Sequence, residues 1–146
     1  MTPEALFGLV GLPAVLGWAV LILAPRRWPP LLWLPGLIIP LALSLIYAVL
    51  ILTHFAGADG GFDSLAALRL LFADDWLLLA GWLHYLAFDL MVGTLMAVRM
   101  DRAGIIRLVQ APVLLLVFLF GPLGVVLALL TEAALRLPQP RLKGAI

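Results

Sequence analysis

Cysteine is absent from the chain, and charged residues make up only 12% of its 146 positions. The lack of cysteine excludes disulfides, thiol nucleophiles and thiolate metal ligands. A soluble globular domain carries about 25% charged residues, so a chain this poor in charge and 65% hydrophobic is expected to be a membrane protein. The net charge of +1 gives no basis for nucleic-acid binding. We therefore expect a small multi-pass protein with one domain over residues 1–146.

Four apolar stretches are long enough to cross a bilayer as helices, which takes about 20 residues. No basic region precedes the first stretch, so we expect it to remain in the protein rather than to act as a cleaved signal. Pro122, inside the last stretch, predicts a bend there. The sequence thus predicts an all-α membrane protein with four transmembrane helices, at about residues 5–25, 31–55, 76–98 and 108–131.

The connection over residues 56–75 combines turn residues with a short apolar segment. Its GADGG run is typical of a turn, because glycine and aspartate adopt positive φ at little cost. The following FDSLAALRLLF predicts a short helix over about residues 63–72, capped by Asp63 or Ser64 and lying in the membrane interface. At the other end of the chain, the proline-broken basic residues 137–146 predict a flexible tail.

The distribution of lysine and arginine gives the expected orientation. The first and third connections between spans carry five arginines, namely Arg26, Arg27, Arg99, Arg102 and Arg107. The other side would carry four basic residues, namely Arg69, Arg136, Arg141 and Lys143. This small excess predicts that both termini and the 56–75 loop lie outside the cytoplasm.

The stretch from Gly81 to Gly93, GWLHYLAFDLMVG, is the one place where a histidine and a carboxylate sit deep inside an apolar segment. Asp89 is the only formally charged residue between Trp76 and Val98, which places it near the bilayer midplane. An aspartate there costs at least about 2.5–3.5 kcal/mol, so it is a functional candidate. We expect Asp89 to be largely protonated at neutral pH, because ionising a lone carboxylate in hydrocarbon is costly.

Because alternate helices run in opposite directions, depth in the membrane can be compared between them. His84 should be level with Tyr47, and Asp89 should lie near the level of Ser44. We therefore expect one cavity that runs from the 56–75 side to mid-membrane. His84 and Asp89 are its catalytic candidates, His54 and Glu132 support them, and the ligand-binding candidates are Ser44, Tyr47, Trp82, Tyr85, Phe88, Gly93 and Pro122.

The five-residue spacing of His84 and Asp89 separates them by about 140° around a regular helix. They should not pair directly, since facing partners are three or four residues apart. Each faces a different neighbouring helix, or the two flank opposite walls of one pocket. The structural alternative is that both make interhelical hydrogen bonds, each worth about 0.6–2 kcal/mol.

Histidine and carboxylate are also typical metal ligands. The two histidines, His54 and His84, lie on different predicted helices, and no His-x-x-x-His or Glu-x-x-His spacing occurs. We therefore predict no metal site and no cofactor, with haem or a metal as the alternative. Neither a glycine-rich phosphate loop nor a dinucleotide fingerprint is present.

The run HYLAFDLMVG, preceded by GGFDSLAALRLLF and followed by FGPLG, resembles the abscisic-acid-deficient-four-like family of small integral membrane proteins. The resemblance covers nearly the whole chain, and plant members of the family are required for making neoxanthin. This chain lacks their plastid-targeting extension, so it resembles a bacterial member of the inner membrane. The positions that match the family pattern are His84, Asp89, Gly93, Gly121, Pro122 and Gly124.

The resemblance implies a function on a carotenoid or a related terpenoid lipid within the membrane. The plant conversion is an isomerisation of an epoxy-carotenoid to an allenic one, which needs an acid at the epoxide oxygen and a base beside the polyene. Asp89 and His84 would supply these roles without a cofactor. The alternative is a non-catalytic scaffold that holds pigment, haem or a partner helix. Expected partners are membrane lipid, the apolar ligand and a second copy of the chain, with no nucleic acid.

Overall fold

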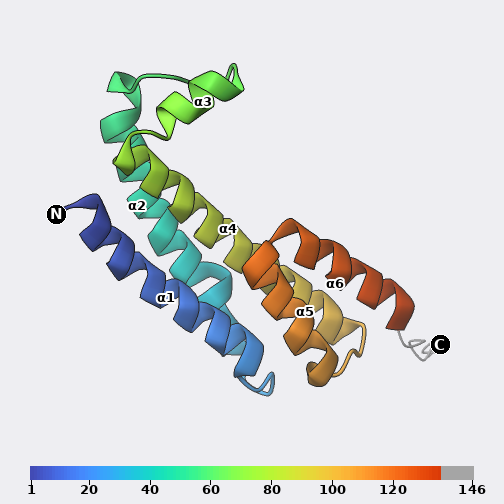
Figure 1. Ribbon diagram of the computed structural model, residues 1–146. Coiled ribbons are helices and arrows are strands. Elements are labelled where there is room, and N and C mark those ends of the chain that lie inside the picture. Colours follow the sequence, from blue (N-terminus) through green and yellow to red (C-terminus); the bar gives the residue numbers. More distant parts are fainter. Residues whose placement is uncertain (136–146) are drawn as a thin grey trace, which may run out of the picture.

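The computed structural model describes residues 1–135, in which every regular element is helical (Figure 1). The all-α prediction is thus confirmed, whereas the four-span arrangement is not. The predicted flexible tail over 137–146 lies outside the described residues. Three stretches are long and apolar enough to cross a membrane, with mean hydropathies of 2.4, 2.4 and 1.4: Pro3–Leu23, Pro29–Gly57 and Asp75–Arg102. These helices indicate a membrane protein.

The first stretch is a single helix, α1 (Pro3–Leu23), and the second is built from several pieces. Pro35 and Pro40 explain the interruption, because each lacks a backbone N–H and clashes with the carbonyl four residues earlier. The backbone forms one wide π-helical turn at this point, in which the Ile39 N–H donates to the Leu34 carbonyl five residues back. The pieces are η1 (Pro29–Leu32), η2 (Leu34–Ile38), α2 (Ile39–His54) and η3 (Phe55–Gly57).

The helix expected over 63–72 is α3 (Leu65–Leu71). Ser64 caps it by accepting a hydrogen bond from the Ala67 N–H at 3.1 Å, as one of the two predicted caps. The loop then leads to Asp74, whose carboxylate accepts from the Trp76 and Leu77 N–H groups at 2.9 and 3.1 Å. This cap fixes the start of the longest helix, α4 (Asp75–Arg102).

Helix α4 is the centre of the bundle, since it packs against α1, α2 and both helices that follow it. Its side chains Leu83, Leu90 and Ala97 are fully buried, each about two turns from the next on one face. The core therefore follows α4 along its length rather than filling a space between equivalent helices (Figure 1).

The predicted fourth span over 108–131 is not one kinked helix but two, α5 (Arg107–Phe120) and α6 (Pro122–Leu135). Gly121 ends α5 with φ +42°, a left-handed backbone, and Pro122 starts α6 at the position where its missing N–H costs nothing. Figure 1 shows α6 running back beside α5. Pro122 therefore marks a reversal where the sequence predicted a bend.

Because of this reversal, α6 ends beside the C-terminal end of α4. Glu132 of α6 forms an ion pair with Arg99, near the end of α4, at 2.8 Å. Glu132 was expected to support a cavity that opens on the 56–75 side, and it lies instead at the opposite end of α4. At 1.5 Å per residue, the 14 residues of α5 span about 21 Å, short of a hydrocarbon core of roughly 30 Å. Neither α5 nor α6 is long enough to be a span by itself, and the two form an apolar hairpin.

This topology is testable with single cysteines, because the native chain has none. Cysteine at Asp59 should react with a membrane-impermeant thiol reagent from one side of the membrane only. Cysteine at Arg27 and at Leu135 should react only from the other side. Labelling in right-side-out and inverted vesicles measures this, and a Leu135 cysteine that labels together with Asp59 would contradict the hairpin.

Candidate functional site

The Asp89 carboxyl lies against the turn between α5 and α6. A Cβ atom added to Gly121 would sit 3.0 Å from Asp89 Oδ2 and 3.2 Å from Oδ1, so only a hydrogen atom fits between them. The HYLAFDLMVG and FGPLG segments, about 30 residues apart in sequence, therefore meet in space. Gly124 closes the same turn, because its Cβ position is occupied by the backbone of Val117 on α5.

Tyr85 is the polar neighbour of Asp89. It lies four residues earlier on α4, where side chains share one face, and its hydroxyl interacts with the carboxyl. The hydroxyl also donates to the Phe118 carbonyl of α5 at 3.4 Å. Asp89 Oδ2 is buried and has no hydrogen-bond partner among residues 1–135. The site thus contains a carboxyl oxygen and a phenol whose bonding capacity is not used up by the protein.

Gly93, one helical turn after Asp89 on α4, lets another helix pack closely rather than contacting a ligand. Its Cβ position lies 2.3 Å from the Trp18 ring of α1, so α1 and α4 approach closely only because this residue is glycine. Trp18 in turn contacts Phe118 of α5, with 5.3 Å between ring centroids. Gly93, one of the ligand-binding candidates, is therefore buried beneath Trp18.

His84 lies on a different side of α4. Its exposed ring stacks on Phe88 at 4.6 Å and contacts Tyr47 of α2 at 5.8 Å. His84 and Tyr47 line one cleft of about 360 Å³ between α2, α3 and α4, which we call the aromatic cleft. It is lined by Tyr47, Ile51, Phe55, Phe62, Leu71, Phe72, Leu77, Gly81 and His84.

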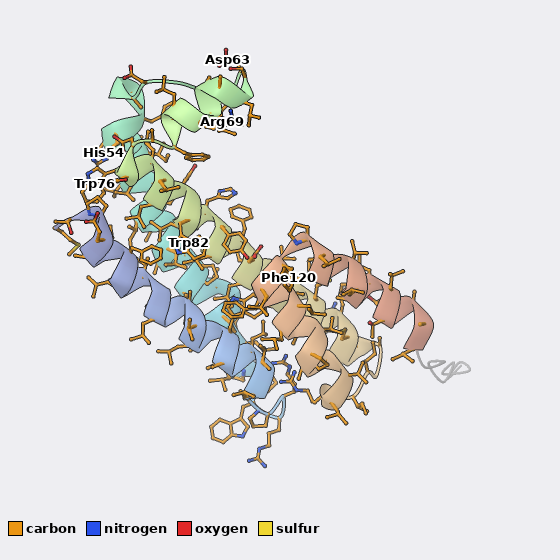
Figure 2. All side chains as sticks on the ribbon, viewed as in Figure 1. His54, Asp63, Arg69, Trp76, Trp82 and Phe120 are labelled. Carbon is orange, nitrogen blue, oxygen red and sulfur yellow. The ribbon has the colours of Figure 1, made fainter. Side chains whose placement is uncertain are left out.

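Asp89 and His84 therefore face different neighbours, the first of the two arrangements that the spacing allowed. The expected single cavity is not formed. His54 stacks on Trp76 at 5.1 Å near the α3 end, Ser44 is half-buried outside the lining of the aromatic cleft, and Glu132 binds Arg99 (Figure 2). Of the predicted cavity residues, only Tyr47 and His84 line the aromatic cleft.

The remaining ligand-binding candidates border the Asp89 site from the bilayer side. Trp82 is 39% exposed and stacks on Tyr85 at 5.3 Å, with Phe7 of α1 against it at 5.9 Å (Figure 2). Phe88 is 53% exposed. Pro122 is exposed at the start of α6. We call the surface formed by Trp82, His84, Tyr85 and Phe88 the aromatic face of α4.

No three histidine or carboxylate side chains come together as a metal-binding group within residues 1–135. Sequence reasoning overlooked two other clusters. One is the Tyr85–Asp89 pair, whose signal was the four-residue spacing. The other joins Arg26, Asp101 and the fully buried Gln110 where α1, α4 and α5 meet. Its signal was a glutamine in an apolar segment next to charged connections.

The family described as ABA DEFICIENT 4-like matches residues 5–127, and the chain therefore belongs to this family, which is associated with neoxanthin formation. Comparison with curated proteins and with solved structures gave no match. The matched region contains the three spans and the turn of the hairpin, so it includes both Asp89 and Gly121.

The Asp89–Gly121 contact predicts the effect of Gly121→Ala. The substitution should destabilise the protein by about 1–2 kcal/mol, because alanine is strained at φ +42° and its methyl group would press on the carboxylate. Gly11→Ala is the matched control, since a Cβ there meets no atom within 4 Å. Thermal unfolding in detergent measures both, and equal unfolding temperatures would contradict the contact.

Proposed function

We propose that the protein binds a carotenoid or a related terpenoid lipid inside the membrane and isomerises it at Asp89. The observation that carries this proposal is the buried Asp89 Oδ2, which has no hydrogen-bond partner among the described residues. A buried polar atom without a partner costs about 1–3 kcal/mol, so a ligand that hydrogen-bonds to it gains that energy. An oxygen-bearing lipid at mid-membrane supplies such a group.

The apolar part of the ligand would pack against the aromatic face of α4. The hairpin covers α4 only up to its turn at Gly121, so the part of α4 that precedes Asp89 stays uncovered on that side. Around the helix, Phe88 and Tyr85 lie between His84 and Asp89, at about 40° and 100° from His84. A long polyene lying across these rings would extend from the aromatic cleft to the carboxyl.

Asp89 can supply both proton transfers of the isomerisation associated with the family. The protonated acid gives its proton to the epoxide oxygen as the carbon–oxygen bond breaks, which leaves a cation delocalised over the polyene. The carboxylate then takes a proton from the adjacent carbon, so the allene forms and the acid is restored. Oxygen gains one proton and carbon loses one, so no redox partner is needed. When the acid ionises, the Tyr85 hydroxyl turns from the Phe118 carbonyl, to which it donates at 3.4 Å, and donates to the carboxylate instead, which stabilises it.

His84 takes a binding role in this proposal. Its ring contacts Tyr47 and Phe88, whereas the Asp89 carboxyl contacts Gly121 and Tyr85. We assign His84 and Tyr47 to holding the far end of the ligand in the aromatic cleft. A hydroxyl on that end would find the imidazole and the phenol within one cleft of about 360 Å³.

Asp89→Asn is the decisive variant. Asparagine keeps the shape of the protonated acid but cannot exchange a proton, so conversion of an added epoxy-carotenoid should fall by about 10²–10⁴-fold. The unfolding temperature should stay nearly unchanged. Product analysis by chromatography, with the protein in vesicles, measures the activity. Tyr85→Phe should reduce conversion less, because it removes only a hydrogen bond.

His84→Gln is the matched control on the other side of α4. It should weaken retention of bound pigment, read from the absorption spectrum of the purified protein, while leaving the turnover of saturating substrate largely intact. If the wild-type protein retains a pigment and converts none, the isomerase proposal fails and a binding function remains. Full conversion by Asp89→Asn would also exclude the proton-transfer role.

A further inference from the structure

The aromatic cleft has one wall that does not belong to the bundle. Two of its walls come from the ends of α2 and α4, which pack against each other. The third wall consists of Phe62, Leu71 and Phe72, which lie in the connection between these helices. Figure 1 shows this connection, with α3, beyond the end of the bundle. One wall of the cleft can therefore move without displacing a span.

The connection is weakly attached to the bundle. Leu71, 3% exposed, is the only buried side chain of residues 58–74, and it lies outside the core that follows α4. Within residues 1–135, no hydrogen bond or ion pair joins residues 59–73 to α2 or α4. Besides Leu71, the attachment consists of two aromatic contacts, described next.

These contacts lie on opposite sides of the cleft. Phe62 stacks on Phe55, at the end of α2, with 5.8 Å between the ring centroids. The Phe72 ring packs on Gly81 of α4, where an added Cβ atom would lie 3.1 Å from Phe72 Cε1. Both contacts are between apolar groups without hydrogen bonds, so separating them leaves no polar atom unpaired.

The connection itself is a rigid unit. The Gly61 N–H donates to the Ala67 carbonyl of α3 at 3.2 Å. Gly60 has φ +95°, and its Cβ position is occupied by the same carbonyl, so the turn before α3 folds directly onto the helix. Residues 60–72 can therefore move as one body, with the changes in backbone angle confined to the residues on either side.

The surroundings of α3 lower the cost of such a movement. Phe62 and Leu65 are 74% and 65% exposed, and a short helix with exposed apolar side chains rests in the membrane interface. When the connection swings away, Leu71 and Phe72 pass from the cleft into lipid rather than into water. Little apolar surface is then exposed to water, so the hydrophobic effect opposes opening only weakly.

We propose that residues 59–73 form a lid on the aromatic cleft, which opens at the membrane interface to admit one end of a lipid ligand. The lid swings as a unit and separates Phe62 from Phe55 and Phe72 from Gly81. The ligand rests on the proposed function, in which the aromatic cleft holds the far end of a carotenoid. The motion of the lid does not rest on it.

The motion is tested with single cysteines, because the native chain has none. Leu71→Cys places a thiol under the lid, and Leu50→Cys, 5% exposed in the core near the same end of the bundle, is the matched control. In vesicles without pigment, N-ethylmaleimide should label the first at least about ten-fold faster, because a local opening uncovers only that position. Equal labelling rates overturn the lid.

Entry of the ligand is tested by tying the lid down. In the double variant Phe55→Cys with Phe62→Cys, a short, reducible bifunctional thiol reagent joins the lid to the end of α2. Cross-linking should slow the transfer of an epoxy-carotenoid from vesicles to this variant about ten-fold, and reduction should restore the rate. The absorption spectrum of the re-purified protein measures the transfer.

A second pair of cysteines controls for the reagent. Ala66→Cys with Leu70→Cys, four residues apart on the exposed side of α3, cross-links within the lid and should leave the transfer rate unchanged. Equal slowing in both pairs, or unchanged transfer in the pair at Phe55 and Phe62, overturns the lid as the entry.

The two experiments separate this inference from the proposed function. A wild-type protein that takes up no carotenoid defeats the proposed function and, with it, the ligand named here. Faster labelling of Leu71→Cys in the same protein would still support the lid. Carotenoid conversion together with equal labelling of Leu71→Cys and Leu50→Cys would support the proposed function and overturn the lid.

Discussion

A backbone reversal within an apolar medium is the constraint on which the rest of the structure depends. No water is available in hydrocarbon to satisfy exposed peptide groups, so a turn there must bond internally. The turn at Gly121 does so, because its N–H donates to the Val117 carbonyl at 2.8 Å and its carbonyl accepts from Val125 at 3.1 Å. The tight hairpin then brings Gly121 onto Asp89, and with that contact it forms one wall of the candidate site.

The central helix presents chemically different surfaces to its neighbours. Towards α5 and α6, α4 presents a carboxyl and a phenol; towards α2 and α3 it presents an imidazole among aromatic rings. At its far end Asp101 pairs with Arg26 and accepts a hydrogen bond from the buried Gln110.

The sequence predicted what depends on local chemistry. Apolar length identified the three long spans, and Ser64 marked the start of a helix. The separation of His84 and Asp89 by about 140° allowed for different neighbours. It did not predict the hairpin, because Gly121 and Pro122 permit either a bend or a reversal. What decides between them is Gly124, where only the absence of a side chain lets α6 lie on α5, together with the Glu132–Arg99 ion pair. Such long-range contacts have no signature in local spacing.

The hairpin has a consequence for how the chain is inserted into the membrane during synthesis. If α5 and α6 enter and leave on the same side, neither moves a polar segment across the bilayer. Helix α4 must then insert before anything covers Asp89, at a cost of about 2.5–3.5 kcal/mol for an aspartate at mid-span. Its seven leucines, each contributing roughly −0.5 kcal/mol, offset that cost. With that topology, insertion would come first, and the site would be assembled only when the last 30 or so described residues dock onto α4.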